Sequence, residues 1–182
     1  MVITFTKKEK PYAHWELLDS ELGNYLRIVP ERGGLITEWK CNARDILYFD
    51  FQRFQQKEKS IRGGIPILFP ICGSLSGHSK LKQHGFARDS NWKIDFIDDQ
   101  NCLILTLLDN EATRILYPYS FRIDIKVHLE ENALEFKIEI CNLSKGMMPC
   151  SLGLHPYFNV RDLSRTKIEG LNSTCVNHIS MM

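Results

Sequence analysis

The sequence contains no long apolar run, no marked charge imbalance and no paired cysteines. No apolar stretch approaches the roughly 20 residues that a membrane-spanning helix needs. Lysine and arginine total 23 against 22 acidic residues, so no strong field attracts nucleic acid or an acidic membrane surface. The opening MVITFTKKEK places its charges after a short apolar run, the reverse of a secretory signal. We therefore expect a cytoplasmic protein that binds neither nucleic acid nor membranes.

Metal-binding patterns are also missing. The six cysteines and six histidines form no C-x-x-C or H-x-x-x-H pair and match no zinc-ligand spacing. Because the chain carries no export signal, reduced and mostly buried thiols are favoured over disulfides. We expect neither a metal nor a cofactor. Repeats, low-complexity tracts and linkers are absent as well, so residues 1–182 are interpreted as a single domain.

What the sequence does contain is a series of strands. Apolar and polar residues alternate from Phe121 to Leu129 and again from Leu134 to Cys141, across a short polar break. Such a period of two on both sides of a turn predicts an antiparallel hairpin with one solvated face. A second hairpin is predicted from Trp92 to Leu108, with its second strand buried on both faces because Leu103–Leu105 and Leu107–Leu108 are apolar.

Gly and Pro separate four further candidate strands, as is typical of an all-β protein. These candidates are His14–Leu18, Tyr25–Val29, Leu35–Lys40 and Ile46–Phe49. Helix is expected only as short turns within Phe51–Lys59 and Asp109–Leu116.

Three segments do not read as plain sheet. They are R-G-G-I-P-I-L-F-P-I-C-G (Arg62–Gly73), Q-H-G-F-A-R (Gln83–Arg88) and L-G-L-H-P-Y-F (Leu152–Phe158). Each places an Arg or His beside Gly or Pro, where the backbone can approach a ligand or is held extended. A polar side chain on such a backbone is well placed to project into a cleft.

A structural role explains any one of these motifs about as well as a functional one. Loop histidines often cap turns, and Tyr157 and Phe158 can be core residues. His128 lies on the polar face of a regular strand, so we expect it to be solvated. His14, His78 and His178 lack a supporting context, and we assign them no role.

Taken together and in this order, the motifs resemble those of the aldose 1-epimerase family. The branch with hexose-6-phosphate mutarotases has R-G-G-I-P-x-x-F-P, Q-H-G-F-A-R and L-H-P-Y-F as signatures, and all three stand intact here. The resemblance extends through V-P-E-R-G-G (Val29–Gly34) and Y-P-Y-S-F (Tyr117–Phe121), so it covers nearly the whole chain.

This resemblance implies a galactose-mutarotase-like antiparallel β-sandwich with a sugar cleft. It also implies interconversion of the α and β anomers of an aldohexose or hexose 6-phosphate. In that reaction His155 looks like the general acid and His84 like a second imidazole near the reacting end, a task that suits histidine at neutral pH. Arg62, Gln83 and Arg88 match substrate-binding positions, and guanidinium forks hold phosphate oxygens in pairs.

The sequence departs from the family in its later part. The family's general base is a glutamate in a Glu-Pro-Trp-like motif, and neither that motif nor the family's later substrate-binding aspartate is present. Asp89, the carboxylate nearest to a site motif, is expected to pair with Arg88 or to face water. The resemblance thus implies half an active site on a sandwich that is incomplete at the C-terminus.

Three interpretations remain open. The chain is an epimerase whose other half is supplied elsewhere, a catalytically inactive sugar-binding module, or a truncated gene remnant. In each case an incomplete sandwich leaves strand edges unpaired and exposes apolar residues such as Leu152, Leu154 and Phe158. We therefore expect weak mutarotation by this polypeptide alone, together with self-association or a partner chain.

Overall fold

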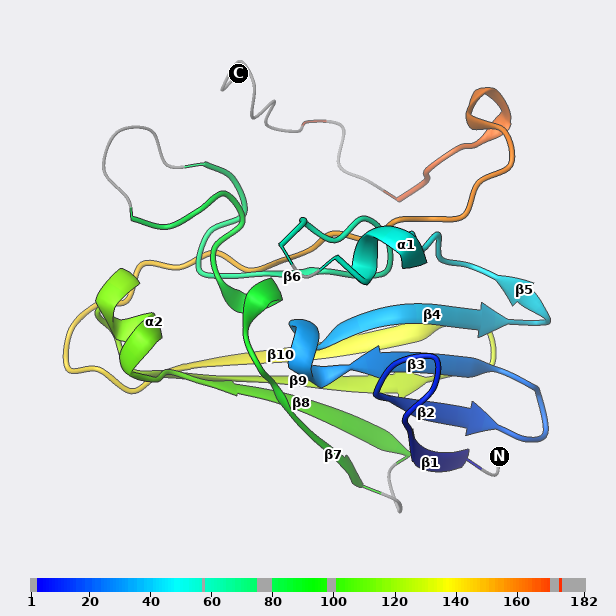
Figure 1. The fold of residues 1–182 in the computed structure, drawn as a ribbon, viewed down its shortest axis with the longest axis horizontal. Coiled ribbons are helices and arrows are strands. Elements are labelled where there is room, and N and C mark those ends of the chain that lie inside the picture. The colour runs from blue at the N-terminus through cyan, green and yellow to red at the C-terminus, as the bar shows by residue number, and fades with distance from the viewer. Residues whose placement is uncertain (1–2, 57, 75–79, 98–100, 171–173, 175–182) are drawn as a thin grey trace.

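A computed structural model describes residues 3–56, 58–74, 80–97, 101–170 and 174 of the chain (Figure 1). Two antiparallel sheets with the orders β1-β2-β3-β4-β5 and β10-β9-β8-β7 form its two layers, and β6 and β11 form a small additional pair. The strands are β1 (Ile3–Lys8), β2 (His14–Asp19), β3 (Tyr25–Val29), β4 (Leu35–Cys41), β5 (Arg44–Asp45), β6 (Ile67–Leu68), β7 (Lys93–Ile97), β8 (Cys102–Leu108), β9 (Phe121–Leu129), β10 (Leu134–Asn142) and β11 (Gly153–Leu154).

Apolar side chains from the facing sides of the two sheets form one core. Leu17 and Leu26 of the first sheet and Leu105 and Ile125 of the second are fully buried in the same cluster. Alternate residues along these strands therefore enter the core, as the period of two requires. The predicted all-β sandwich is confirmed.

Both helices are short and lie within the predicted ranges. In α1 (Phe51–Phe54), the Asp50 side chain accepts a hydrogen bond from the Arg53 backbone N–H. In α2 (Glu111–Leu116), Asn110 and Thr113 exchange the reciprocal side-chain and backbone bonds of a capping box. Three single turns of 3₁₀ helix complete the described elements: η1 (Pro30–Arg32), η2 (Ala87–Asp89) and η4 (Leu163–Arg165).

Both predicted hairpins are present, with one correction. The strands β9 and β10 pair along their whole length, and β7 pairs with β8. The expectation that β8 is buried on both faces is wrong. Leu103, Leu105 and Leu107 enter the core, whereas Leu108 is 42% exposed. On the second face, Cys102 is buried and Ile104 and Thr106 are half-buried, so this face is only partly covered.

Two further strand assignments need correction. The N-terminal β1, which pairs with β2, lies outside every predicted range. The predicted strand Ile46–Phe49 does not form, because its residues bridge two different segments: Leu47 pairs with Phe158, and Phe49 pairs with Gly63. The strand that closes this edge is the two-residue β5, which pairs with β4.

The five described cysteines are all free thiols, but the expectation of mostly buried thiols is wrong for them. Cys41 and Cys102 are buried, Cys72 and Cys141 are half-buried, and Cys150 is exposed. Cys175, His78 and His178 lie outside the described residues. No helix in the described part is long and apolar enough to cross a membrane.

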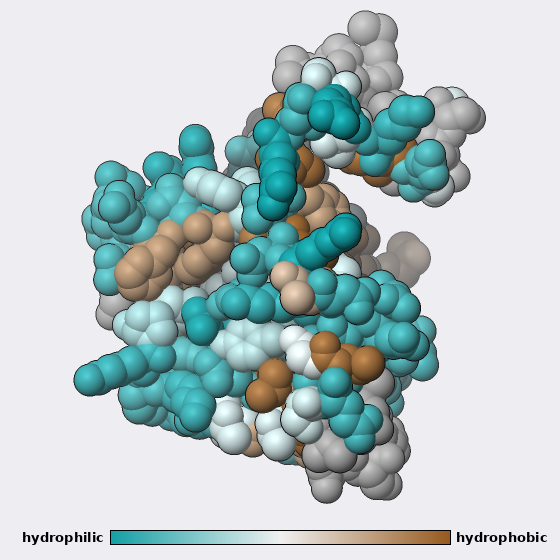
Figure 2. All heavy atoms as spheres, turned by 90° about the vertical axis from the view of Figure 1, so that its right-hand side faces the viewer, coloured by the Kyte–Doolittle hydropathy of each residue, from teal (hydrophilic) through white to brown (hydrophobic). Residues whose placement is uncertain are grey.

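The segment after β11 runs along the top of the molecule and then away from it (Figure 1). Viewed from the right-hand side of Figure 1, this segment forms an arm above the body, with apolar side chains among polar ones (Figure 2). Leu163 is 81% exposed and Ile168 is 70% exposed. Phe158 is 52% exposed as expected, whereas Leu152 and Leu154 are half-buried against the core.

Candidate active site

The first and third sequence motifs lie side by side. The strand β6 belongs to the R-G-G-I-P segment and β11 to the L-H-P-Y-F segment, and Leu154 pairs with Ile67. The pairing continues beyond the strands: the His155 N–H donates to the Pro66 carbonyl (3.0 Å), and the Tyr157 N–H donates to the Gly64 carbonyl (2.9 Å). The backbone of His155 is therefore fixed by β6 and its flanking residues.

The second motif packs against the other end of the same segment. Gly85 bridges Phe69, and the Phe86 N–H donates to the Phe69 carbonyl (2.9 Å). Gly85 has a positive φ of +71°, and a Cβ built on it would lie 2.0 Å from the Phe69 carbonyl oxygen. Only glycine fits this position, so the close approach of the two backbones requires the glycine of Q-H-G-F-A-R.

These pairings bring two imidazole rings together. The ring centroids of His84 and His155 lie 5.7 Å apart, and Tyr157 lies 5.1 Å from His155. The Nδ1 of His84 is 2.5 Å from the carbonyl oxygen of Cys72, which can only accept a hydrogen bond. Nδ1 is therefore the donor, and in a neutral His84 ring the lone pair lies on Nε2.

Both histidines line a cleft of about 990 Å³, which is large enough for a sugar. Among the five predicted site residues, His84, Arg88 and His155 line this cleft. Arg62 and Gln83 are exposed and do not line it, although their sequence neighbours Ile61, Lys82 and His84 do. The Gln83 carbonyl accepts a hydrogen bond from Arg88 Nη2 (3.1 Å), so Gln83 contacts the cleft arginine rather than the cleft.

Sequence reasoning missed most of the charged lining. Four cationic and three acidic side chains line the cleft: Arg32, Lys59, Lys82, Arg88, Glu31, Glu58 and Asp89. The V-P-E-R-G-G segment supplies two of them, but the sequence pattern gave those two no role. Asp89 is exposed as expected and forms no ion pair with Arg88. Among the described residues, these three carboxylates are the ones placed to act as a base in the cleft.

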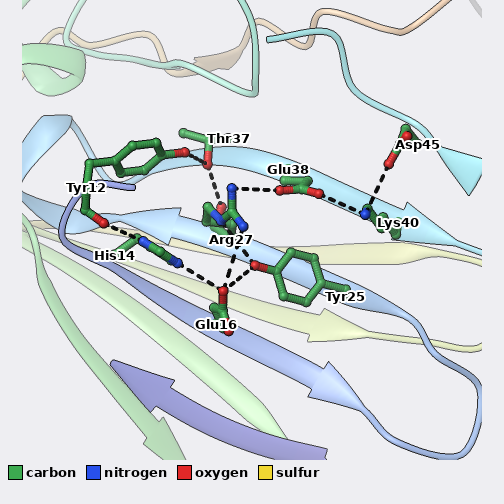
Figure 3. A network of polar contacts seen from close by, with 9 residues as sticks. All are labelled: Tyr12, His14, Glu16, Tyr25, Arg27, Thr37, Glu38, Lys40 and Asp45. Carbon is green, nitrogen blue, oxygen red and sulfur yellow. Dashed lines mark hydrogen bonds and ion pairs between the residues drawn. The ribbon is translucent and has the colours of Figure 1, made fainter. Parts of the chain in front are cut away.

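A ladder of alternating charges crosses the outer face of the first sheet beside the cleft (Figure 3). Arg27 is central: its Nη1 lies 2.9 Å from Glu38, and its Nη2 lies 3.7 Å from Glu16. Lys40 extends the ladder from Glu38 (3.2 Å) to Asp45 (3.7 Å). Each strand from β2 to β5 contributes, so the ladder ties four strands together.

Buried His14 ends the ladder at the cleft. Its Nε2 lies 3.0 Å from Glu16 Oε1 and its Nδ1 lies 2.5 Å from the Tyr12 carbonyl oxygen. Burial raises the pKa of Glu16, but hydrogen bonds from Tyr25 and His14 and the charges of His14 and Arg27 outweigh burial and hold the pKa below its ordinary value. Tyr12 lines the cleft, so the ladder anchors one cleft wall.

Fold and site together define an antiparallel β-sandwich with two neighbouring imidazoles in its cleft. The family model described as aldose 1-epimerase matches residues 19–181, so the chain belongs to the aldose 1-epimerase family. Residues 1–18, which include β1, precede that match.

Two relatives carry the name "Putative glucose-6-phosphate 1-epimerase". The protein from Cenchrus ciliaris is 31% identical over 159 residues, which are 78% of this chain and 46% of the relative. The protein from Salmonella typhimurium is 28% identical over 153 residues, which are 82% of this chain and 50% of the relative. The chain thus spans about half the length of the curated relatives that it matches.

Two solved structures are similar to this chain. A crystal structure of a protein from Synechocystis sp. PCC 6803 is 42% identical with a TM-score of 0.78, and the match covers 89% of this chain and 59% of that one. The galactose mutarotase related enzyme from Lactobacillus acidophilus is 23% identical with a TM-score of 0.65. The match covers 90% of this chain and 52% of that one. The second likeness concerns the fold alone.

Proposed function

We propose that this chain binds an aldohexose or a hexose 6-phosphate in the His84–His155 cleft and takes part in the interconversion of its α and β anomers. The observation that carries the proposal is the pair of imidazoles 5.7 Å apart in a sugar-sized cleft. Family membership and the names of the two curated relatives support the reaction class. The proposal includes a cytoplasmic location, which free thiols support.

The chemistry consists of proton transfers and the reversible breaking of one C–O bond, with no change of oxidation state, so we propose no cofactor or metal. A base removes the proton of the C1 hydroxyl, the bond between C1 and the ring oxygen breaks, and an acid protonates that oxygen. After rotation about the C1–C2 bond, the reverse steps close the ring on the other face of the aldehyde. His155 is proposed as the acid, while His84, held by Cys72, directs its Nε2 lone pair toward a sugar hydroxyl.

The general base has three candidates among the described residues of the cleft. The sequence lacks the Glu-Pro-Trp motif, and the described carboxylates in the cleft are Glu31, Glu58 and Asp89. A positioned general base contributes about 10²–10⁴-fold to the rate. A second candidate function, which the polar and aromatic lining of the cleft also allows, is a sugar-binding module that binds the ligand without converting its anomers.

One set of measurements separates the two functions. Sugar binding is measured by calorimetric titration and anomer exchange by NMR exchange spectroscopy, for the unchanged protein, His155→Ala and His128→Ala. His128 is a half-buried strand residue outside the cleft and serves as the control. Exchange that is lost only in His155→Ala supports an epimerase. Binding without accelerated exchange supports the binding module, and absence of sugar binding contradicts both.

A further inference from the structure

Arg32 is the last residue of η1 and lines the cleft, although the family motifs assign it no role. Its guanidinium stacks over the Phe54 ring at 4.8 Å, and its Nη1 donates to the Phe54 carbonyl at 3.3 Å. Phe54 ends α1, so the helix holds one side of the guanidinium in place. A fixed, half-buried guanidinium retains several N–H donors for a ligand.

The two cleft arginines lack the carboxylate partners that Arg27 has on the neighbouring sheet face. Arg27, which is also half-buried, contacts the carboxylates of Glu16 and Glu38. By contrast, the hydrogen bonds of Arg32 and Arg88 go to backbone carbonyls, and neither has a carboxylate within 4.0 Å among the described residues. Charge that is partly withdrawn from water is costly without a counter-charge. An anionic ligand would supply the missing counter-charge for the two guanidiniums.

The backbone holds these two arginines on neighbouring turns. The Gly33 N–H donates to the Ser90 carbonyl (2.9 Å), and the Trp92 N–H donates to the Pro30 carbonyl (3.0 Å), so η1 and η2 are joined. Gly33 has a φ of +82°, and a Cβ there would lie 2.1 Å from the Arg88 carbonyl oxygen. The close approach therefore depends on glycine immediately after Arg32.

We propose that Arg32 is a further ligand-binding residue, which together with Arg88 binds the anionic group of an acidic sugar. This inference rests on the proposed function and narrows its substrate class. A phosphate ester matches best because two guanidiniums can share its three terminal oxygens. A sugar carboxylate offers related chemistry with two oxygens. Four cations against three carboxylates in the lining leave the cleft positive, which favours either anion.

The test is a calorimetric titration with four ligands: hexose 6-phosphate, hexuronate, the neutral hexose and inorganic phosphate. The proteins are the unchanged chain, Arg32→Gln and Arg122→Gln. Arg122 is an exposed β9 residue outside the cleft, so its variant controls for the loss of one positive charge. Arg32→Gln should weaken hexose 6-phosphate and inorganic phosphate by about tenfold or more and leave the hexose unchanged. Arg122→Gln should change none of them.

Several results would overturn the inference: no binding of either phosphate ligand or hexuronate to the unchanged protein, an equal loss for charged and neutral ligands, or an equal effect of Arg122→Gln. If Arg32→Gln instead weakens only the binding of hexuronate, the ligand is a sugar acid. If Arg32→Gln fails to fold, Arg32→Lys replaces it. Lysine keeps the positive charge but lacks the planar pair of guanidinium donors. Arg32→Lys should therefore weaken phosphate ester binding while neutral hexose binding persists.

The inorganic phosphate arm separates this inference from the proposed function. Phosphate binding that depends on Arg32, without any hexose binding, supports the anion site and contradicts the sugar function. The converse result is also possible: hexose binding and anomer exchange depend on His155, and Arg32→Gln changes the binding of no ligand. That result supports the sugar function and contradicts the anion site.

Discussion

The rings of His84 and His155 lie 5.7 Å apart because both residues are hydrogen-bonded to one central segment, residues 64–72. The His155 N–H donates to the Pro66 carbonyl, and the His84 ring contacts the Cys72 carbonyl. The pair is therefore built into the backbone pairing and needs no ligand to assemble. Groups fixed in this way lose little entropy when a ligand binds.

Gly85→Ala should destabilise the protein and disturb His84. The added Cβ would lie 2.0 Å from the Phe69 carbonyl oxygen, and a φ of +71° is unfavourable for alanine. The positive φ alone costs about 1–2 kcal/mol, and the backbone contact adds to it. Denaturant unfolding measures the loss. Gly146→Ala is the control, since nothing lies within 4 Å of its added Cβ and its φ is not positive. Equal stability of the two variants would contradict this account.

His14→Leu should cost about 3 kcal/mol in the free energy of unfolding, because it leaves the Tyr12 carbonyl and part of the Glu16 carboxylate without a donor. Both partners of the buried ring accept, so the bonding is complete when both nitrogens carry hydrogen. Denaturant unfolding of the variant and of the unchanged protein measures the loss. His128→Leu, at a half-buried site without these bonds, should cost less than 1 kcal/mol. A loss in His14→Leu no larger than that in His128→Leu would contradict the assigned bonding.

Acid should weaken the fold through Glu16. Its pKa is lower in the folded state than its ordinary value of 4.5, so the folded protein favours the ionised form. The stabilisation is fully present above pH 4.5 and is lost as the pH falls through the lower folded pKa. In urea titrations, Glu16→Gln should be less stable than the unchanged protein at pH 7, with a smaller difference at the acid end. Glu135→Gln, at an exposed ion pair, should leave the acid dependence unchanged.

The strands could be predicted wherever one face alternates over many residues, as in β9 and β10. In β1, by contrast, only Ile3 and Phe5 alternate before two lysines interrupt the pattern. His14 and Glu16 share a strand face, but the burial of His14 depends on contacts from the loop around Tyr12. The role proposed for Arg32 depends on the pairing of η1 with η2, which are far apart in the sequence. Local sequence patterns do not predict such long-range contacts.

The last prediction concerns self-association along β10. Among the described residues, β10 pairs only with β9, so its other edge presents free backbone donors and acceptors. Apolar side chains continue from this edge: Leu143 is 60% exposed and Met147 is 93% exposed. We expect reversible self-association at micromolar to millimolar concentration, with the contact centred on the β10 edge and residues 143–147.

Sedimentation velocity of the double variant Leu143→Lys, Met147→Lys tests this expectation. The two added charges should shift the protein toward monomer, and stability should change little because both side chains are largely exposed. Leu163→Lys is the matched control: Leu163 is 81% exposed in η4, away from β10. If Leu163→Lys shifts the protein toward monomer as strongly as the double variant does, the association is non-specific contact between apolar surfaces. If the unchanged protein is monomeric throughout, the β10 edge is not an interface.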